Sequence, residues 1–354
     1  MPAYPESVSA DTAVIRPEDA VLIAGVNWLG DSIMSMPAIQ AFRQAHPQTK
    51  LVMLVKPKLA ALWTLQGAID ETWSLPDSLN GMIRTARRAA ARRFRAAYIL
   101  PHSFRSALVP FLARIPKRVG MPGHARDWML TRVVQPPSIP GQKHQCHEYM
   151  ALLGMSEPPA PTPRLTLAKA LRDQTQSRMG TAAVPWAALL PGSAFGLAKC
   201  WPAEHFIALG KMLKSALNCG IVLLGSASER DLCELVAQGI GPGTVNFAGQ
   251  TSLPELAAIL ARCAVVVAND SGGMHLAAAV GTPVLAIFGI TDPQKTGPLG
   301  VRTRVLQDSS RRSRDIERTS EEAALSLRRI RPEQVLEAAR ILLKDSKLKL
   351  IGDN

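Results

Sequence analysis

Four short stretches of this chain combine small residues with polar or charged side chains, and each could act on an anionic substrate. The first, GVNWLGDS at 25–32, has the spacing of the phosphate-binding pattern GxxxxGK[ST], but Asp31 stands where the pattern has lysine. A carboxylate there would repel a triphosphate, so the stretch is not a phosphate-binding loop. Asp31 either complements the dipole of the helix that begins here or accepts a proton during a reaction.

The second and third stretches could bind the two parts of a nucleotide. In PGSAFGLAKCWP at 191–202, small residues end an apolar strand and Lys199 precedes a helix, where its cation could neutralise a phosphate. In GSASE at 225–229, small residues would let a ligand approach the backbone closely. Glu229 either accepts hydrogen bonds from ribose hydroxyls or closes a capping box with Ser226.

The fourth stretch, ANDSGGMHL at 268–276, follows a wholly apolar strand and begins a helix. Backbone amides left open by its two glycines, together with the helix dipole, predict an anion site. His275 lies one turn inside that helix, where it could bind the same anion, although a single histidine more often has a structural role.

These stretches lie between alternating strands and helices. In the first half we expect strands at 20–26, 51–55 and 96–100, and a helix at 32–46. In the second half we expect strands at 187–190, 221–224, 244–247, 264–267 and 284–288, separated by helices at 202–217, 228–239, 253–262 and 273–280. This alternation predicts an α/β fold with parallel, doubly wound sheets, whose ligands bind beyond the carboxyl ends of the strands.

Chain length and a proline-rich segment divide the protein in two. The 354 residues correspond to about two domains of typical size. Pro158, Pro159, Pro161 and Pro163 predict a stiff, extended linker. We therefore expect an N-terminal domain at 1–175, a C-terminal domain at 176–330 and a last helix within 331–354. The Arg-rich segment before that helix is expected to be an exposed excursion.

Basic residues are concentrated in the first half of the chain. Residues 1–180 hold 22 Lys and Arg against 12 Asp and Glu, a net +10, whereas 181–354 hold 19 against 16, a net +3. Within 84–134, twelve basic side chains accompany one acid, Asp127. Such a region could serve nucleic acid, an anionic lipid surface or an acidic substrate, or be a solvated helix face. Because only Phe94 is interleaved with the arginines of 84–95, base stacking on nucleic acid is not favoured.

Composition excludes several other classes of protein. A hydrophobic fraction of 47% with 19% charged residues is typical of a folded globular protein rather than a disordered one. No uninterrupted apolar window reaches the roughly 18 residues of a membrane span, and the acidic first twenty residues do not resemble a secretory signal, so we expect a cytoplasmic location. Five widely spaced cysteines without a CxxC pair predict reduced, mostly buried thiols.

Six motifs resemble, in their order along the chain, those of the ADP-heptose:lipopolysaccharide heptosyltransferases of glycosyltransferase family 9. They are LGDSIMSMPAI at 29–39, LPHSFRSALVPF at 100–111, PGSAFGLAKCWP at 191–202, LLGSASERD at 223–231, FAGQTSLPELAAIL at 247–260 and NDSGGMHLAAAVGTPVLAIFG at 269–289. The resemblance covers residues 20–343 and is closest to the heptosyltransferase II branch, because of the second and third motifs. The chain departs from the family at Gly273, at Ser193-Ala194, at Cys200 and at the Arg-rich segment 311–318.

The resemblance implies a role for each matching residue. Asp31 would be the catalytic base, Lys199 would contact the donor phosphates and Glu229 the donor nucleoside. The remaining donor-binding residues would be Ser193, Asp270, Ser271, Gly272, Gly273 and His275. From the basic first domain we expect contacts with the acceptor through Asn27, Ser103, Arg105 and Arg118.

The family also implies a fold and a reaction. Its members have the GT-B fold, in which two Rossmann-like domains face each other across a cleft and the last helix tends to pack back on the first domain. We therefore expect inverting transfer of heptose from ADP-heptose to an anionic lipopolysaccharide-core glycolipid, without a metal ion or nucleic acid, at the cytoplasmic face of the inner membrane. The alternatives are a family member with a different donor or core position, a sugar-nucleotide epimerase, which would not need the basic first domain, and a basic nucleic-acid-binding protein.

Overall fold

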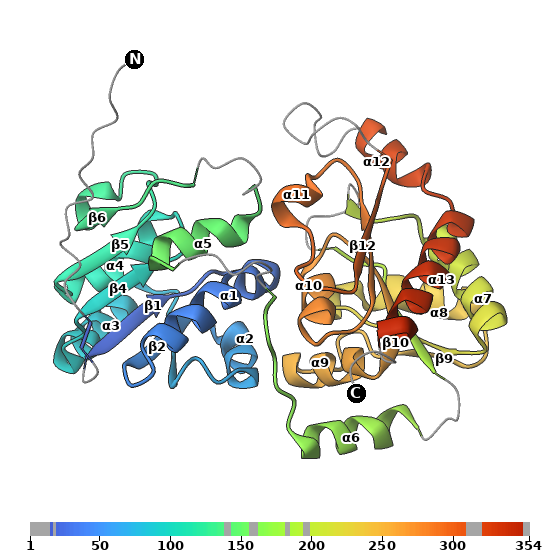
Figure 1. The fold of residues 1–354 in the computed structure, drawn as a ribbon, viewed down its shortest axis with the longest axis horizontal. Helices are drawn as coiled ribbons and strands as arrows, with labels where there is room; N and C mark the ends of the chain where they lie inside the picture. The colour runs from blue at the N-terminus through green and yellow to red at the C-terminus, as the bar shows by residue number, and fades with distance from the viewer. Residues whose placement is uncertain are drawn as a thin grey trace.

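The structure, a computed structural model, describes residues 15–16, 19–137, 143–155, 162–180, 185–193, 199–308 and 321–349. These residues form two α/β domains side by side, each built around a six-stranded parallel sheet (Figure 1). The predicted α/β fold with two doubly wound domains is therefore confirmed. Of the four linker prolines, only Pro163 belongs to the described residues.

The first domain has the strand order β3-β2-β1-β4-β5-β6. In a doubly wound sheet of this order, ligands bind where the order reverses, beside the first strand. Its apolar central strands are buried, because helices cover both faces of the sheet. The elements are β1 (Ala20–Ala24), α1 (Leu29–Ala45), β2 (Lys50–Val55), α2 (Pro57–Ala60), η1 (Ala61–Leu65), β3 (Glu71–Ser74), α3 (Leu79–Arg92), β4 (Ala96–Ile99), α4 (Phe104–Leu112), β5 (Lys117–Gly120), η2 (Asp127–Met129), β6 (Arg132–Val133) and α5 (Gln145–Leu153).

The second domain repeats this order as β12-β11-β10-β7-β8-β9. Its helix starts are well specified by the sequence: Ser252 and Glu255 form the capping box of α9, and Ser226 and Glu229 form another at η4. The elements are α6 (Lys169–Met179), β7 (Trp186–Leu190), α7 (Ala203–Leu217), β8 (Gly220–Leu223), η4 (Ala227–Glu229), α8 (Arg230–Ile240), β9 (Thr244–Asn246), α9 (Leu253–Ala261), β10 (Cys263–Asn269), α10 (Gly272–Ala279), β11 (Val284–Phe288), α11 (Pro293–Thr296), β12 (Thr303–Gln307), α12 (Glu321–Arg328) and α13 (Pro332–Lys349).

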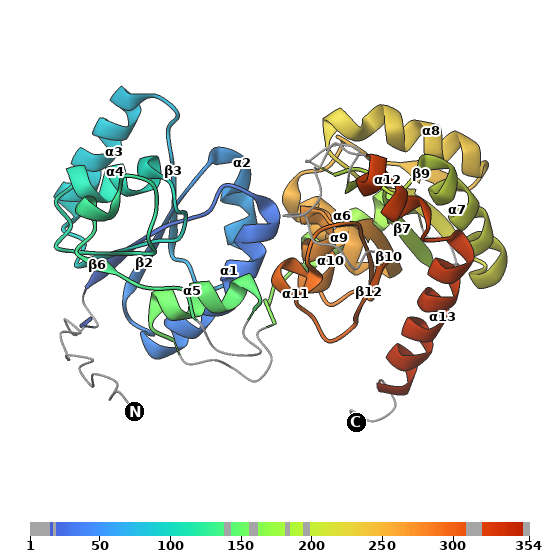
Figure 2. The same cartoon turned by 90° about the horizontal axis from the view of Figure 1, so that it is seen from above.

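Helices α1 and α10 form the centre of the junction between the domains (Figures 1 and 2). Residues 32–39 of α1 and 274–279 of α10 are buried without interruption, although one side of a surface helix is normally exposed. Each helix packs on its own sheet and on the other helix, which removes both sides from water. The loops that precede the two helices are therefore held at the junction.

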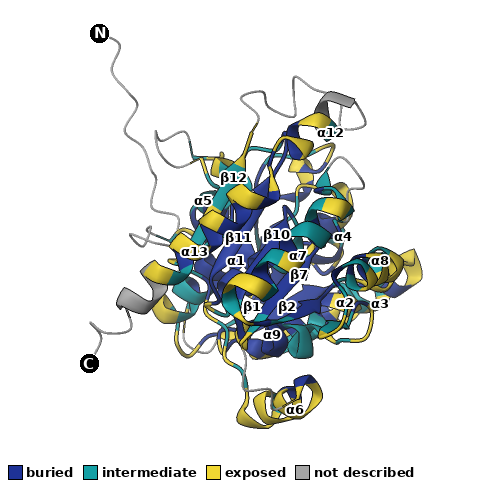
Figure 3. Ribbon diagram, turned by 90° about the vertical axis from the view of Figure 1, so that its right-hand side faces the viewer, coloured by how far each residue is buried: buried dark blue, intermediate teal, exposed yellow. Residues whose placement is uncertain are grey.

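The largest apolar cluster extends across this junction. It includes Ile33 and Leu62 from the first domain and Leu260 and Leu276 from the second. Figure 3 shows that both sheets are buried beneath more exposed helices. A continuous apolar contact of this kind holds two domains in one arrangement more firmly than a polar interface would.

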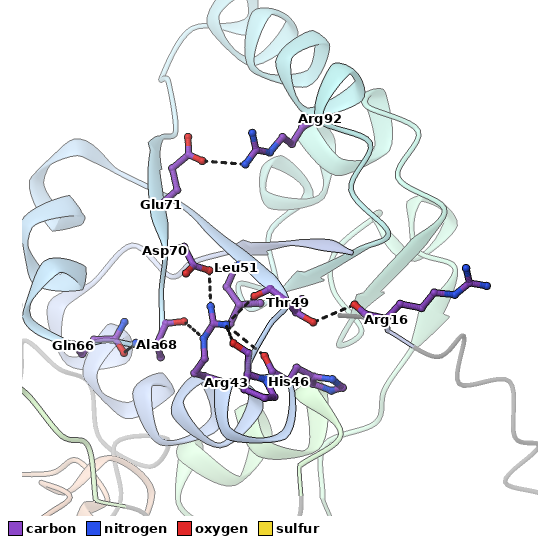
Figure 4. Close-up of polar contacts among 11 residues, drawn as sticks. Arg16, Arg43, His46, Thr49, Leu51, Gln66, Ala68, Asp70, Glu71 and Arg92 are labelled. Carbon is purple, nitrogen blue, oxygen red and sulfur yellow. Dashed lines mark hydrogen bonds and ion pairs between the residues drawn. The ribbon is translucent and has the colours of Figure 1, made fainter. Parts of the chain in front are cut away.

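Arg43 fastens the far end of α1 to the first sheet (Figure 4). Its guanidinium donates hydrogen bonds to the carbonyl oxygens of Ala68 (3.0 Å) and Thr49 (2.8 Å) and to Asp70 Oδ2 (2.5 Å). Asp70 Oδ2 also accepts the backbone N–H of Leu51 at 2.7 Å. This network fixes the C-terminal end of α1 to the first sheet. The position of the whole helix, including its N-terminal turn at the junction, is therefore restrained.

Two helices lie differently from the expected domain limits. Helix α6 packs against α9, and Arg178 pairs with Glu255 at 3.6 Å, so the first domain ends before α6 and not at residue 175. Helix α13 was expected to pack on the first domain, but its described residues Val335 and Ala339 join the core of the second. The apolar side of α13 packs against α7 and against strands β10 to β12 of the second sheet.

Two simpler predictions can be compared with the structure. All five cysteines have free thiols and four of them are buried, as expected. Among the described ranges, no helix combines the length and apolar character that a membrane span requires.

Candidate active site

The first turns of α1 and α10 lie against each other. A Cβ atom added to Gly30 would come within 2.9 Å of His275 Cδ2, and one added to Gly272 would come within 2.8 Å of Leu29 Cβ. Glycine at both places permits this close approach. The loop after β1 of the first sheet and the loop after β10 of the second therefore meet at one place.

Asp270 is the centre of a hydrogen-bonded network beside the start of α10. Its Oδ2 accepts hydrogen bonds from Lys199 Nζ at 2.5 Å and from Thr291 Oγ1 at 2.8 Å, and its carbonyl accepts one from Ser193 Oγ at 3.3 Å. The side chains of Lys199 and Asp270 are only 16% and 8% exposed. Because the ion pair is shielded from water, it holds the ammonium group in a defined position next to the helix start.

Asp31 brings a carboxyl group of the first domain to this network. Burial raises the pKa of Asp31 above its ordinary value of 3.8, the positive charge of Lys199 lowers it and the negative charge of Asp270 raises it. The net shift is upward because loss of hydration outweighs the attraction of Lys199. A carboxylate with a raised pKa is the better proton acceptor as long as it is ionised.

His275 is buried at the same place and is neutral at neutral pH. Burial lowers its pKa to about 4, against the attraction of Asp270. Its Nδ1 is buried and has no hydrogen-bond partner within the described part of the chain. The histidine can therefore offer a hydrogen bond to a ligand at the start of α10, but it does not add a positive charge as an anion site would prefer.

Asn269 fastens the Lys199 loop to the end of β10. Its Nδ2 donates to the carbonyl oxygen of Pro191 at 2.7 Å, and its Oδ1 accepts the backbone N–H of Trp201 at 3.0 Å. The indole of Trp201 is buried and donates to the carbonyl oxygen of Ile330 at 2.8 Å. Residues on both sides of Lys199 are thereby tied to the central strands of the second sheet.

Glu229 performs the capping role that the sequence left open. Its Oε2 accepts hydrogen bonds from the backbone N–H of Ser226 at 2.6 Å and from Ser226 Oγ at 2.8 Å. The other carboxylate oxygen lies against Gly192, where an added Cβ would be 2.1 Å away. The capping box therefore places this carboxylate between the loops that follow β7 and β8.

The departures from the family have partly visible consequences. A Cβ added to Gly273 would lie 2.2 Å from Leu190 Cδ2, so a larger residue here would require Leu190 to move. Burial and the charge of Glu229 raise the pKa of Cys200, which stays a thiol. Ala194 and the Arg-rich segment 311–318 lie outside the described residues.

Among the expected acceptor residues, Asn27 and Ser103 lie beyond the carboxyl ends of β1 and β4. Asn27 Oδ1 is buried and accepts no hydrogen bond from the described residues, which leaves a position for a ligand hydroxyl. Ser103 is exposed at the start of α4. These two residues share the sheet edge on which Asp31 lies.

The two expected acceptor arginines are placed differently. The Arg105 guanidinium donates to the carbonyl oxygens of Pro76 (2.8 Å) and Asp77, and so fastens the loop after β3 to the start of α4. Arg118 lies inside β5 opposite Ala97, and donates through Nε and Nη1 to backbone carbonyls of its own domain. The structure brings Arg105 to the sheet edge and does not bring Arg118 there.

Two residues near the site, Tyr149 and Thr291, were missed by the sequence analysis, and a third, Arg126, has a different role from the one expected. Tyr149 on α5 is buried close to Asp31, whose charge adds to burial in raising the pKa of the phenol. Thr291 supports Asp270, as described above. Arg126, counted in the basic region, is fully buried and donates to Ser106 Oγ at 3.1 Å and to the carbonyl of Met121 at 2.5 Å, so it cannot itself contact a ligand.

Comparison with known proteins identifies the family. The sequence model of the protein family named glycosyltransferase family 9 (heptosyltransferase) matches residues 82–325 of this chain. The chain belongs to glycosyltransferase family 9. It is 29% identical to lipopolysaccharide heptosyltransferase 2 of Escherichia coli, over 81% of this chain and 87% of the relative. It is 30% identical to lipooligosaccharide heptosyltransferase 2 of Haemophilus influenzae, over 81% and 88%.

A solved structure supports the same assignment. The structure of E. coli ADP-heptose lps heptosyltransferase II has a TM-score of 0.81 and 27% identity, covering 93% of this chain and 99% of that one. The family resemblance noted in the sequence and the GT-B arrangement of the two domains are confirmed, and the chain is a glycosyltransferase of the heptosyltransferase family.

Proposed function

We propose that this family 9 enzyme transfers heptose from ADP-heptose to the lipopolysaccharide inner core, with inversion at the anomeric carbon and without a metal ion. The observation that carries the proposal is the convergence of Asp31 from the first domain with Lys199 and Asp270 from the second. One junction thereby offers a proton acceptor on one side and a fixed cation on the other. The E. coli relative is named for ADP-heptose and lipopolysaccharide, and the H. influenzae relative for lipooligosaccharide.

The second domain would bind the donor. The first amides of α10, at Ser271, Gly272 and Gly273, would bind the pyrophosphate together with the helix dipole. Lys199, oriented by one hydrogen bond to Asp270, would donate another to the departing ADP and so stabilise the negative charge that develops there, a role that a metal ion fills in other enzymes. Ser193 and His275 would add neutral hydrogen bonds, and Glu229 would accept hydrogen bonds from the nucleoside.

The first domain would supply the base. The acceptor hydroxyl oxygen attacks the anomeric carbon, the bond from that carbon to the phosphate oxygen breaks, and Asp31 takes the hydroxyl proton while ADP leaves. Inversion follows because the base and the leaving group occupy opposite faces of the sugar. The raised pKa of Asp31 favours this proton transfer.

The acceptor would lie along the edge formed by Asn27, Ser103 and Arg105. An acceptor hydroxyl would donate the hydrogen bond that Asn27 Oδ1 lacks among the described residues. The net +10 of residues 1–180 suits the phosphates and acidic sugars of a core glycolipid, and an enzyme with that acceptor would work peripherally at the inner face of the inner membrane.

The test is a transfer assay on the purified full chain. ADP release should require both ADP-heptose and a truncated core glycolipid, and should continue in the presence of a chelator. Mass spectrometry should show one heptose added to the acceptor, with the anomeric configuration opposite to that of the donor. ADP release independent of the acceptor, retention of configuration or loss of activity with the chelator would each refute the corresponding part of the proposal.

A further inference from the structure

Helix α4 has apolar residues on two opposite sides. The side that faces the core consists of Ser106, Ala107, Val109 and Pro110, all buried. Phe104, Leu108, Phe111 and Leu112 follow the spacing i, i+4, i+7, i+8 and form the other side. Phe104 and Leu112 are 43% and 42% exposed. Leu108 and Phe111 are partly buried against the core, so Phe104 and Leu112 are the apolar side chains of this helix that are most exposed to solvent.

An exposed tryptophan extends this outward side. Trp128 in η2 is 63% exposed and packs edge-on against Phe111, with ring centroids 4.9 Å apart, and against Phe104 at 6.4 Å. We call Phe104, Phe111, Leu112 and Trp128 the α4 patch. Contiguous exposed apolar groups of this kind mark interaction surfaces in soluble proteins.

Basic side chains surround the α4 patch. The Arg118 guanidinium lies 5.7 Å from the Phe111 ring, and Arg114 is exposed two residues after Leu112. Helix α3, which packs beside α4, adds the exposed Arg84 and Arg87, whereas its Arg88 and Arg92 pair with Glu71. Of the acids in this part of the domain, Asp77 pairs with Arg105, and Asp127 accepts the backbone N–H of Gly123 and keeps its charge beside Trp128, where it is outnumbered by Arg84, Arg87, Arg114 and Arg118.

We propose that the α4 patch docks the enzyme on a bilayer that contains anionic lipids. Tryptophan and phenylalanine are the side chains that enter the headgroup and acyl boundary, and a basic rim is attracted to anionic headgroups. A second copy of this chain fits less well, because its own basic rim would meet the first and repel it. Nucleic acid would use the rim but would leave Leu112 and the aromatic edges without a function.

The patch is continuous with the acceptor side of the site. Helix α4 begins at Phe104, directly after Ser103, so the patch starts beside the edge where the acceptor would lie. The link between the patch and the acceptor rests on the proposed function, in which the acceptor is a glycolipid whose acyl chains lie in the membrane. Docking through α4 would hold the bilayer beside that edge, while α7 and α8 lie at the opposite end of the molecule (Figures 1 and 2).

The first experiment measures binding of the full chain to vesicles by flotation. Phosphatidylcholine vesicles with about one lipid in three replaced by phosphatidylglycerol should bind the wild type, and pure phosphatidylcholine vesicles should bind it much less. Trp128→Ser and Leu112→Ser should each weaken binding at least about fivefold. Leu235→Ser is the matched control, since Leu235 is 56% exposed on α8 and should not affect binding.

Several outcomes would overturn the docking surface. These are equal binding to both vesicle types, an equal loss in the Leu235→Ser control, and a dimer of the wild type that Trp128→Ser dissociates. Melting curves show whether a variant is folded. Trp128 Nε1 donates to the carbonyl of Ala125 at 2.9 Å, so Leu112→Ser serves as the variant that breaks no hydrogen bond.

A second experiment separates this inference from the proposed function. With a deacylated, water-soluble core acceptor, Trp128→Ser should turn over like the wild type, and with the acceptor embedded in anionic vesicles it should be several-fold slower. Equal slowing with both acceptors would overturn membrane docking. If the wild type transfers heptose to neither acceptor but still binds anionic vesicles, the proposed function fails and the docking surface stands.

Discussion

The starts of α1 and α10 have the same backbone setting and opposite chemistry. Each follows a strand at the centre of a sheet with the same order, and neither has a side-chain hydrogen bond at its N-cap. Helix α1 has an acid, Asp31, in its first turn, whereas α10 begins with two glycines and lies beside Lys199. The two helix starts thus have the same backbone setting, and under the proposed function the few residues that differ would make one a proton acceptor and the other an anion site.

The largest effect should come from removing the base. Asp31→Asn should lower kcat by roughly 10²–10⁴, because the acceptor hydroxyl loses its proton acceptor. Donor affinity should stay the same. Since the folded state raises the pKa of Asp31, ionisation of this group costs stability at neutral pH, and the melting temperature of the Asn variant should be equal or higher.

Two controls sharpen this test. Asp231→Asn makes the same change in the first turn of α8 and should be nearly neutral for activity. In the wild type, kcat should fall as the pH drops through the raised pKa of Asp31, above the range of an ordinary aspartate, because the protonated carboxyl cannot act as a base. An Asp31→Asn enzyme with a rate near wild type would remove the base assignment.

Next in size is the loss of the cation. Lys199→Ala should slow turnover at least about tenfold and weaken ADP binding, since charged hydrogen bonds of this kind contribute roughly 1.5–3 kcal/mol. The variant also leaves Asp270 buried without its ammonium partner, so a lower melting temperature is expected. Lys211→Ala on α7, where the lysine is exposed, controls for the loss of a charge. Unchanged turnover and ADP binding would exclude Lys199 from the mechanism.

A smaller effect is expected from His275→Asn. Because burial lowers the pKa of His275 to about 4, the ring is neutral and contributes an uncharged hydrogen bond of about 0.5–1.5 kcal/mol, or about tenfold at most. Its contribution should be the same at about pH 6 as at about pH 8. A loss that becomes larger as the pH falls through this interval would indicate a charged histidine and contradict the structure.

The smallest effect is expected from Arg105→Glu, which tests whether acceptor and donor bind to different domains. Arg105→Glu should raise the acceptor KM several-fold, by reversing one exposed charge at the start of α4. Donor binding, measured by calorimetry, should remain close to wild type, and Lys211→Glu on α7 should change neither. If Arg105→Glu weakens donor binding as much as it raises the acceptor KM, the two domains do not divide the work as proposed.

The sequence predicted the buried strands of both sheets better than their edges. Apolar runs identified β1, β2 and β4, and β7, β8, β10 and β11, because these strands are largely buried on both faces. The edge strand β9 was also identified, although its three residues are only half-buried. Strands β3, β5, β6 and β12 were missed, since edge strands such as β6, Arg132–Val133, are short and exposed and carry no apolar period. The path of α13 was also missed, because an amphipathic pattern does not say which surface covers it.

The candidate site shows a similar limit. Asp31, Lys199 and Asp270 were found because each lies in a loop after an apolar strand. Tyr149 has no such signal, since it lies within a helix whose position depends on packing between distant elements. The direction of the Asp31 shift could not be predicted either, because loss of hydration at the junction is a property of both domains together.

The central claim is that α1 serves the acceptor and α10 the donor, and calorimetric binding of ADP to two variants tests it most directly. Asp31→Asn and Lys199→Ala change one charge each, on opposite sides of the junction. The account predicts wild-type ADP affinity for Asp31→Asn and an affinity at least about tenfold weaker for Lys199→Ala. Equal weakening in both variants would show that the two helix starts bind one ligand jointly, and would contradict the division.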